Sequence, residues 1–81
     1  MTTEIEGVVR SLLVEEFKID EADIRREATF KEMGLDSLDV VSLVMALEDR
    51  LGVEIPEREL EGVERLENAL DLLERKIAAR A

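Results

Sequence analysis

The residues from Gly34 to Asp39 read GLDSLD and open the most apolar segment of a highly charged chain. Gly34 ends one piece of backbone, and Asp36 is a residue type that caps helices. Ser37 then falls in the first turn of the next helix, where free backbone N–H groups and the helix dipole favour an attached anion. This stretch predicts a helix that presents one serine at its start.

The helix predicted from this start runs from Ser37 to Leu51 and ends at Gly52. At about 100° per residue it carries two apolar faces. The face assigned to the core comprises Val40, Leu43, Val44, Leu47 and Leu51. The opposite face comprises Leu38, Val41 and Met45, flanked by Ser42, Glu48 and Asp49. A small bundle cannot easily bury both faces, so we interpret the second as a docking surface; the alternative is that the preceding loop covers part of it.

A first helix is predicted over residues 4–17, with Thr3 and Glu6 as a capping box. Its helical stripe consists of Ile5, Val8, Val9, Leu12 and Leu13. The connection 18–35 has no regular pattern, and turns are expected at 20–23 and 28–30. We expect it to run the length of the bundle and to contact the core through Ile19, Ile24, Phe30 and Met33.

After Gly52 the sequence predicts a short helical turn that follows Pro56 and closes at Gly62. A last helix is expected over residues 64–79. Its apolar stripe is Leu66, Ala69, Leu70, Leu73 and Ile77, and Arg75, Lys76 and Arg80 lie at the negative end of its dipole. The predicted fold class is therefore all-α, with three main helices and one short helix, a long first loop and a single domain over residues 1–81.

Composition excludes several classes of function. The chain has 81 residues and a formal charge of −10, which argues against nucleic acid and for partners with Lys or Arg patches. It contains no cysteine and no histidine, which removes thiolate chemistry and the commonest general base and metal ligand. No apolar run approaches about 18 residues, so no transmembrane span is expected, and the first residues lack the basic region of a signal peptide.

Catalysis by Ser37 itself is not expected, because a serine nucleophile needs a base and the chain has no histidine. No segment matches a calcium loop or a phosphate-binding glycine loop, so no metal site is predicted. Ser37 could still accept a phosphate ester from another enzyme, although Asp36 and Asp39 oppose that charge. From the residues alone, the alternative that Ser37 is an ordinary first-turn residue stays open.

The run from Gly34 to Glu48, GLDSLDVVSLVMALE, followed by Glu54-Ile55-Pro56, resembles an acyl carrier protein. The similarity is close over residues 30–73, whereas in the first helix it rests on length and apolar pattern. The resemblance implies a small four-helix bundle of three main helices and one short helix. It also implies that a phosphopantetheinyl transferase uses coenzyme A and magnesium to attach 4'-phosphopantetheine at Ser37. The arm's thiol then holds the acyl group as a thioester, so the protein is a carrier and not an enzyme.

The resemblance also implies sites for partners and cargo. It implies that partner enzymes recognise the carrier through basic patches on their own surfaces; these partners are acyltransferases, acyl ligases, ketosynthases and other synthase enzymes. The residues of this chain that match the recognised positions are Asp36, Leu38, Asp39, Val41, Met45, Glu48 and Asp49. Candidates for lining the acyl chain, which could equally be plain core, are Leu43, Leu47, Ile55 and Leu60. Such docking should be weak and sensitive to salt. We expect a cytoplasmic monomer.

Three positions depart from the pattern of many fatty-acid carriers: Ser42 and Arg50 replace acidic residues, and Glu64 replaces a threonine cap. The pathway is therefore open between fatty-acid and polyketide biosynthesis. The alternatives are an aminoacyl or D-alanine carrier, another specialised secondary-metabolite carrier, and an unmodified helical interaction module. The Gly34-Leu35-Asp36-Ser37 order favours an acyl over an aminoacyl cargo.

Overall fold

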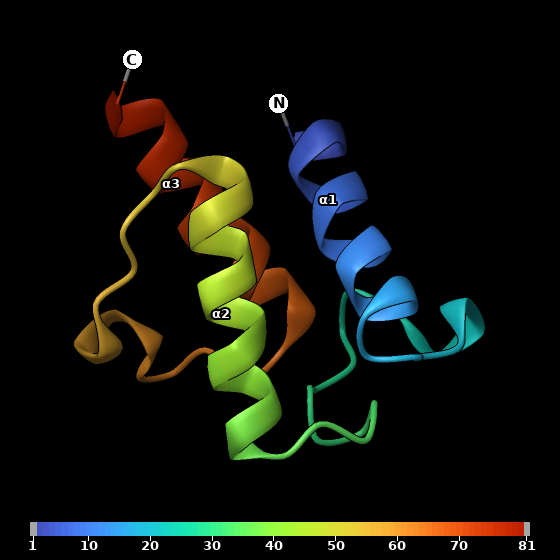
Figure 1. Cartoon of the computed structure of the whole chain (residues 1–81). Helices are drawn as coiled ribbons and strands as arrows, with labels where there is room; N and C mark the ends of the chain where they lie inside the picture. The colour runs from blue at the N-terminus through green and yellow to red at the C-terminus, as the bar shows by residue number, and fades with distance from the viewer. Residues whose placement is uncertain (1, 81) are drawn as a thin grey trace.

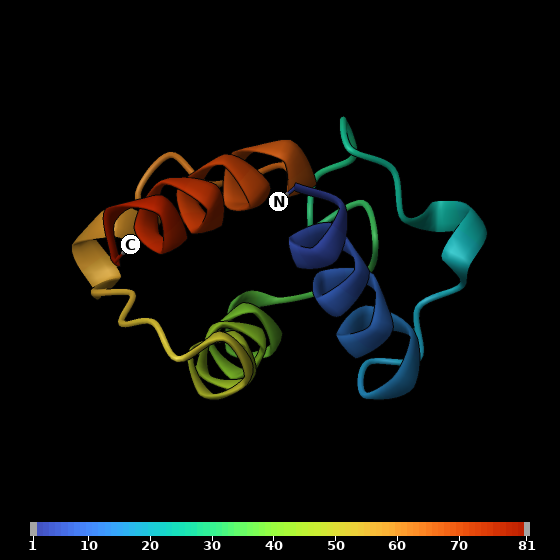
Figure 2. The same ribbon diagram turned by 90° about the horizontal axis from the view of Figure 1, so that it is seen from above.

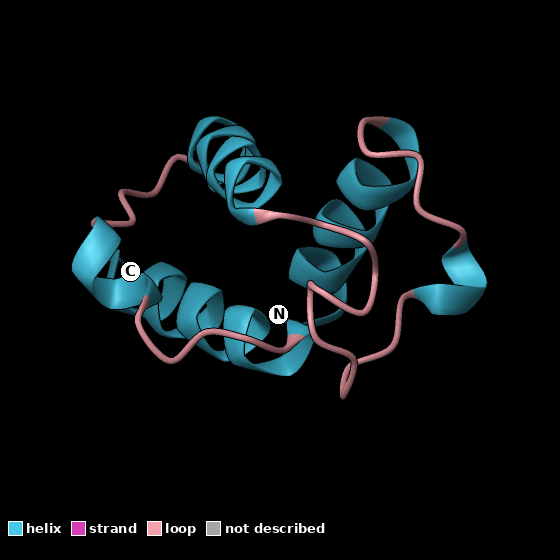
Figure 3. Ribbon diagram, turned by 90° about the horizontal axis from the view of Figure 1, so that it is seen from below, coloured by secondary structure: helices cyan, strands magenta, loops and turns pink. Residues whose placement is uncertain are grey.

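The computed structural model describes residues 2–80, and the side chains of residues 4–79. It has three α-helices, and its elements follow the order α1 (Thr2–Glu15), η1 (Glu21–Asp23), α2 (Ser37–Leu51), η2 (Glu57–Leu60) and α3 (Leu66–Arg80), where η denotes a short 3-10 helix. Between residues 2 and 80 there is no strand (Figure 3). An isolated bridge pairs positions 29 and 65. The predicted all-α fold is confirmed, with three main helices and the predicted short helix after Pro56; a second short helix, η1, lies where a turn was expected.

The three long helices surround one apolar core. Figure 1 shows α1 and α2 running in opposite directions, and the view from above in Figure 2 places α3 across both. α1 contacts both α2 and α3, whereas α2 and α3 approach each other less closely. The segment 52–65, which contains η2, spans the space between α2 and α3 (Figure 2).

The core is built almost entirely from aliphatic side chains. The stripe predicted for the first helix is confirmed, because four of its five residues are buried and Val8 packs against them. The predicted stripe of α3 also faces the core. Leu72 of this helix is buried as well, although the helical periodicity did not assign it to the core. The largest fully buried side chains come from α1 and α3: Val9, Leu12, Leu13, Leu66, Leu70 and Leu73.

The prediction that the long connection runs the length of the bundle is wrong. Because α1 and α2 are antiparallel, α1 ends at the same end of the molecule at which α2 begins (Figure 1). The connection instead crosses to α3: the Phe30 N–H donates to the Glu64 carbonyl at 3.0 Å, and the Leu66 N–H donates to the Ala28 carbonyl at 3.1 Å. Its predicted core contacts are otherwise right, since three are buried and Ile19 is half-buried.

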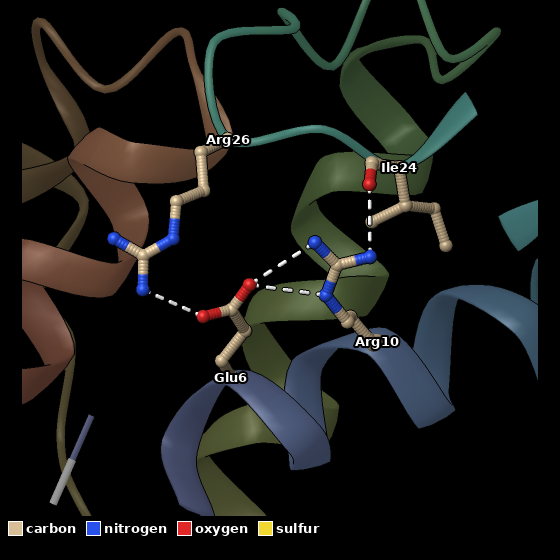
Figure 4. A network of polar contacts seen from close by, with 4 residues as sticks. All are labelled: Glu6, Arg10, Ile24 and Arg26. Carbon is tan, nitrogen blue, oxygen red and sulfur yellow. Dashed lines mark hydrogen bonds and ion pairs between the residues drawn. The ribbon is translucent and has the colours of Figure 1, made fainter. Parts of the chain in front are cut away.

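A network of charged groups fastens the same connection to α1 (Figure 4). The Glu6 carboxylate pairs with Arg26 of the connection at 2.6 Å and with Arg10, one turn along α1, at 3.0 Å. Arg10 also donates to the Ile24 carbonyl at 2.8 Å. The hydrogen bond from Arg26 lowers the pKa of the Glu6 carboxyl, and that from Arg10 adds to the effect.

The first helix is shifted from its predicted bounds. It begins at Thr2, which places Thr3 inside the helix; the predicted capping box involves a side chain outside the described ones. The helix ends at Glu15 rather than at residue 17. Lys18 adopts a left-handed conformation with φ of 59°, and the Ile19 N–H returns to the Leu13 carbonyl at 3.0 Å. A non-glycine residue therefore makes the turn for which glycine is the usual signal.

The last helix begins at Leu66, two residues later than predicted. Glu64 and Arg65 are held by hydrogen bonds and bridge pairing to the long connection, so their backbone is extended. Arg65 precedes the helix, and its N–H donates to the Asn68 side chain at 3.0 Å. The residue before the helix is thus Arg65, not Glu64 as the sequence suggested.

Candidate functional site

The start of α2 is fixed by two aspartates. The Asp36 carboxylate accepts from the Asp39 N–H at 2.8 Å, and the Asp39 carboxylate accepts from the Asp36 N–H at 3.2 Å. This reciprocal capping box satisfies two amides that a helix start otherwise leaves unpaired. Ser37 follows directly as the first helical residue and is exposed. The predicted cap at Asp36 and the helix bounds 37–51 are confirmed.

An open groove of about 610 Å³ lies beside Ser37. One wall is the end of the long connection, where Thr29 and Glu32 exchange hydrogen bonds of 2.8 and 3.0 Å between side chain and backbone. The bond from the Thr29 N–H lowers the pKa of the Glu32 carboxyl. The residues that line the groove are Thr29, Phe30, Lys31, Gly34, Leu35, Asp36, Ser37, Val40, Val63 and Glu64.

A second, smaller cavity of about 70 Å³ lies between α2, η2 and α3, and its lining is apolar. Its lining residues are Phe30, Val40, Leu43, Val44, Leu47, Ile55, Leu60, Val63, Ala69, Leu72 and Leu73. All four residues predicted to line an acyl chain are in this set. Phe30, Val40 and Val63 line both the groove and the cavity, so the two spaces are adjacent and share these three side chains as a wall.

The second apolar face of α2 is open to solvent. Leu38 is 75% exposed, Met45 63% and Val41 51%, which makes them the most exposed large apolar side chains among the described residues. The alternative in which the long loop covers this stripe is therefore wrong. We call Leu38, Val41 and Met45 the exposed stripe.

The acidic residues predicted for partner recognition differ from one another in exposure and in hydrogen bonding. Asp36 and Asp39 use their carboxylates in the helix cap, and Asp49 is exposed. Glu48 is only partly exposed, and its carboxylate accepts from the Ile55 N–H at 2.8 Å. Helical periodicity places Glu48 near the exposed stripe but gives no signal for a contact with a residue beyond Gly52.

Sequence reasoning missed several cavity residues and the groove. Val63 and Phe30 were not assigned to a site, because they lie in irregular segments whose path depends on long-range backbone bonds. Leu72 was missed because it is adjacent to the predicted stripe of α3 rather than within it. Its position next to Leu73 and three residues after Ala69 was the only available signal.

The described part of the chain lacks both a metal-binding cluster and a membrane-spanning helix. Residues 2–80 contain no cluster of three or more acidic side chains arranged to hold a metal ion. None of the helices described here combines the length and apolarity needed to cross a membrane.

Comparison with known proteins identifies the family. Residues 7–73 match the family model described as the phosphopantetheine attachment site. The structure is similar to the crystal structure of an acyl carrier protein from Thermotoga maritima, with a TM-score of 0.88 and 26% sequence identity; the match covers 99% of this chain and 94% of that one.

Fold and comparison together define a small helical carrier protein. The chain belongs to the phosphopantetheine attachment family, in agreement with the predicted resemblance to acyl carrier proteins. It is therefore a carrier and not an enzyme, and its cofactor is covalently attached 4'-phosphopantetheine. The open groove provides room for such a group beside an exposed hydroxyl, so the residues present fit the cofactor.

Proposed function

We propose that Ser37 is the attachment residue and that the chain carries acyl intermediates between enzymes of fatty-acid or polyketide biosynthesis. The observation that carries the proposal is the position of Ser37: exposed, first in a capped helix and beside a groove that adjoins an apolar cavity. The phosphopantetheine supplies the thiol that holds the acyl group as a thioester. In the transfer, the Ser37 oxygen loses its proton and forms the phosphate ester, and the nucleotide of coenzyme A leaves.

The chain's own residues prepare this site. Asp36 and Asp39 turn their carboxylates to each other's backbone amides, which fixes Ser37 at the positive end of the α2 dipole. Lys31 is exposed and lines the same groove, so its side chain adds positive charge to the groove. The positive end of the α2 dipole and the charge of Lys31 offset part of the repulsion that Asp36 and Asp39 would otherwise impose on a phosphate ester.

The test is the intact mass of the protein before and after incubation with coenzyme A, magnesium and a broad-specificity phosphopantetheinyl transferase. We expect the gain of one phosphopantetheine in the wild type and none in Ser37→Ala. Ser42→Ala is the matched control, because Ser42 is an exposed serine on the same helix. Modification of Ser37→Ala would overturn the assignment, and no gain in a folded wild type would favour an unmodified interaction module.

We further propose that the apolar cavity receives the start of the acyl chain. Leu43, Leu47, Ile55 and Leu60 line it, and it adjoins the groove at Ser37, with which it shares three lining residues. Loading assays with fatty-acyl, malonyl, aminoacyl and D-alanyl donors and their enzymes would identify the cargo. Exclusive loading by an adenylating enzyme with an amino acid would replace the acyl proposal with the aminoacyl one.

The exposed stripe is proposed as the surface on which basic partner enzymes dock. Acidic side chains flank it on a chain of charge −10, which complements a surface rich in Lys and Arg. Each exposed ion pair contributes little, so docking should weaken as salt rises. We propose that the carrier is a cytoplasmic monomer; light scattering on the modified protein would test its oligomeric state.

A further inference from the structure

The sulfur atoms of methionine are the groups of this chain that mild oxidants attack most readily. The sequence has three methionines but no cysteine, histidine, tryptophan or tyrosine, so it lacks the other side chains that peroxides commonly oxidise. Oxidation turns the flexible, apolar thioether into a polar sulfoxide. What that change does to the protein depends on where each methionine lies.

Two methionines have described side chains, and their surroundings are opposite. Met33 is 6% exposed and belongs to the hydrophobic core, so an oxidant reaches it only when the protein opens locally. Met45 is 63% exposed on the outer face of α2. A small oxidant in solution therefore reaches the Met45 side chain while the protein stays folded.

The neighbours of Met45 along α2 leave it open to solvent. One turn before it, Val41 and Ser42 are exposed. One turn after it, Glu48 is partly exposed and Asp49 is exposed. Met45 is also one of only three side chains in the exposed stripe, so it forms a large part of the apolar surface that a docking partner would bury.

We propose that Met45 is a site of reversible oxidation by hydrogen peroxide and that its sulfoxide weakens docking on the exposed stripe. The effect on docking rests on the proposed function of that stripe. In the reaction, a lone pair of the sulfur attacks one peroxide oxygen, so that an S–O bond forms and the O–O bond breaks. The released hydroxide takes the proton of the transferred oxygen and leaves as water; the sulfur is oxidised by two electrons and the peroxide is reduced by two.

The reverse step needs a reductant, which is a dithiol used by methionine sulfoxide reductases. The dithiol becomes a disulfide, and the oxygen of the sulfoxide leaves as water. The thioether of Met45 is then restored. The site can therefore pass repeatedly between an apolar and a polar state without any change in the covalent backbone.

A sulfoxide at Met45 affects docking more than folding. In the free protein the sulfoxide oxygen is hydrated, because the side chain is exposed. A partner that covers the exposed stripe removes this water, and a polar oxygen left without a hydrogen bond in the interface costs free energy. Oxidation of Met33 would instead place a polar oxygen in the core and destabilise the fold.

The first test is the position and rate of oxidation. The unmodified protein, which has no thiol, is treated with hydrogen peroxide, and peptide mapping by mass spectrometry follows each methionine separately. Because the exposed fractions of Met45 and Met33 differ about tenfold, we expect oxidation of Met45 to be about tenfold faster or more. Unfolding in urea should remove the difference. Equal rates in the folded protein would overturn the assignment of the site.

The second test is the affinity of a phosphopantetheinyl transferase for Ser37→Ala, measured by titration calorimetry, so that no transfer takes place. Oxidation of Met45 should raise the Kd about fivefold or more, as expected for one unpaired polar group in an interface. Methionine sulfoxide reductases with a dithiol should restore the original Kd. An unchanged Kd at complete oxidation of Met45 would overturn the proposal.

Two variants in the Ser37→Ala background separate Met45 from other effects of peroxide. Met45→Leu keeps an apolar side chain of similar volume without sulfur, so peroxide should leave its Kd unchanged. Met45→Gln carries a permanent polar group and should bind as weakly as the oxidised protein. Urea denaturation should give the same midpoint for all of these proteins. If peroxide weakens binding by Met45→Leu as much as it does with methionine present, the effect arises elsewhere and the proposal fails.

Failure of this proposal and failure of the carrier proposal are distinguishable. Neither the oxidation rates nor the affinity of Ser37→Ala requires phosphopantetheine, and the intact-mass test at Ser37 requires no oxidant. A protein that gains phosphopantetheine but binds the transferase equally in both oxidation states would keep the carrier function and lose the role of Met45.

Discussion

α1 and α2 have 14 and 15 residues, yet they divide their apolar side chains differently. In α1, Val9, Leu12 and Leu13 are at most 1% exposed. In α2 only Leu43 and Leu47 are buried, and the exposed stripe faces solvent. α1 contacts both other helices, whereas the less closely packed space between α2 and α3 contains the cavity. One helix thus gives its apolar side chains to the core, whereas the other divides them between the core, a cavity and the solvent-exposed surface.

The largest expected effect compares one leucine of α1 with one methionine of the exposed stripe. Leu12→Ala should lower the free energy of unfolding by about 2–5 kcal/mol, because it leaves a cavity in a fully packed region. Met45→Ala should change it by less than about 0.5 kcal/mol. Urea denaturation measures the free energy of unfolding of both variants, provided that their m-values equal that of the wild type. Similar losses for the two variants would remove the distinction between the helices.

A second prediction concerns a substitution that fills the cavity between α2 and α3, so that this region is packed as closely as the surroundings of α1. Ala69→Val adds volume from α3 into the space that Leu43 and Leu60 also line. We expect the free energy of unfolding to change by less than about 1 kcal/mol, because an existing void accepts the added methyl groups. An octanoyl thioester should become more accessible to hydroxylamine. Ala46→Val on α2, outside the cavity lining, is a control that should leave thioester cleavage unchanged.

A third prediction concerns a substitution that should stabilise α1. Gly7 lies on the exposed side of this helix, and an added Cβ would meet no atom within 4 Å. Gly7→Ala should raise the free energy of unfolding by about 0.5–1 kcal/mol, because alanine loses less backbone entropy in a helix. Thermal and urea unfolding should agree on the sign, and phosphopantetheine attachment should be unaffected. A loss of stability would show that α1 needs the glycine.

The smallest predicted effect concerns the charged network of Figure 4. The pKa of Glu6 in the folded protein lies below its ordinary value of 4.5, so its stabilising contribution is complete above that pH and is lost as pH falls through the folded pKa. Glu6→Gln should cost a few tenths of a kcal/mol at pH 7, as partly exposed ion pairs do. The difference from wild type should shrink below pH 4.5. A difference that grows on acidification would contradict the assigned pairing.

The sequence predicted α2 to the residue because both of its ends carry strong local signals, Asp36 at the start and Gly52 in a left-handed conformation at the end. It misplaced the end of α1, where Lys18 makes the turn, and the start of α3, where residues 64–65 pair with the long connection. Local patterns thus located helices that begin and end by local chemistry. Helix ends that depend on backbone contacts with distant residues could be located only in the structure.

The candidate site divides in the same way. Ser37 and the exposed stripe were found from one helix and its periodicity, because their environment is local to α2. The groove and the cavity combine side chains from four segments, and no single segment carries a pattern for them. The contact between Glu48 and the Ile55 amide was likewise outside the reach of a helical wheel.

The crossing of the long connection to α3 has a consequence for the order of events during synthesis. The Phe30 amide and the Ala28 carbonyl bond to residues 64 and 66, more than thirty positions later in the chain. The wall of the groove beside Ser37 therefore cannot form on the ribosome until the beginning of the last helix has emerged. A nascent chain that stops before residue 64 therefore has Ser37 but lacks the backbone partners that hold this wall of its groove.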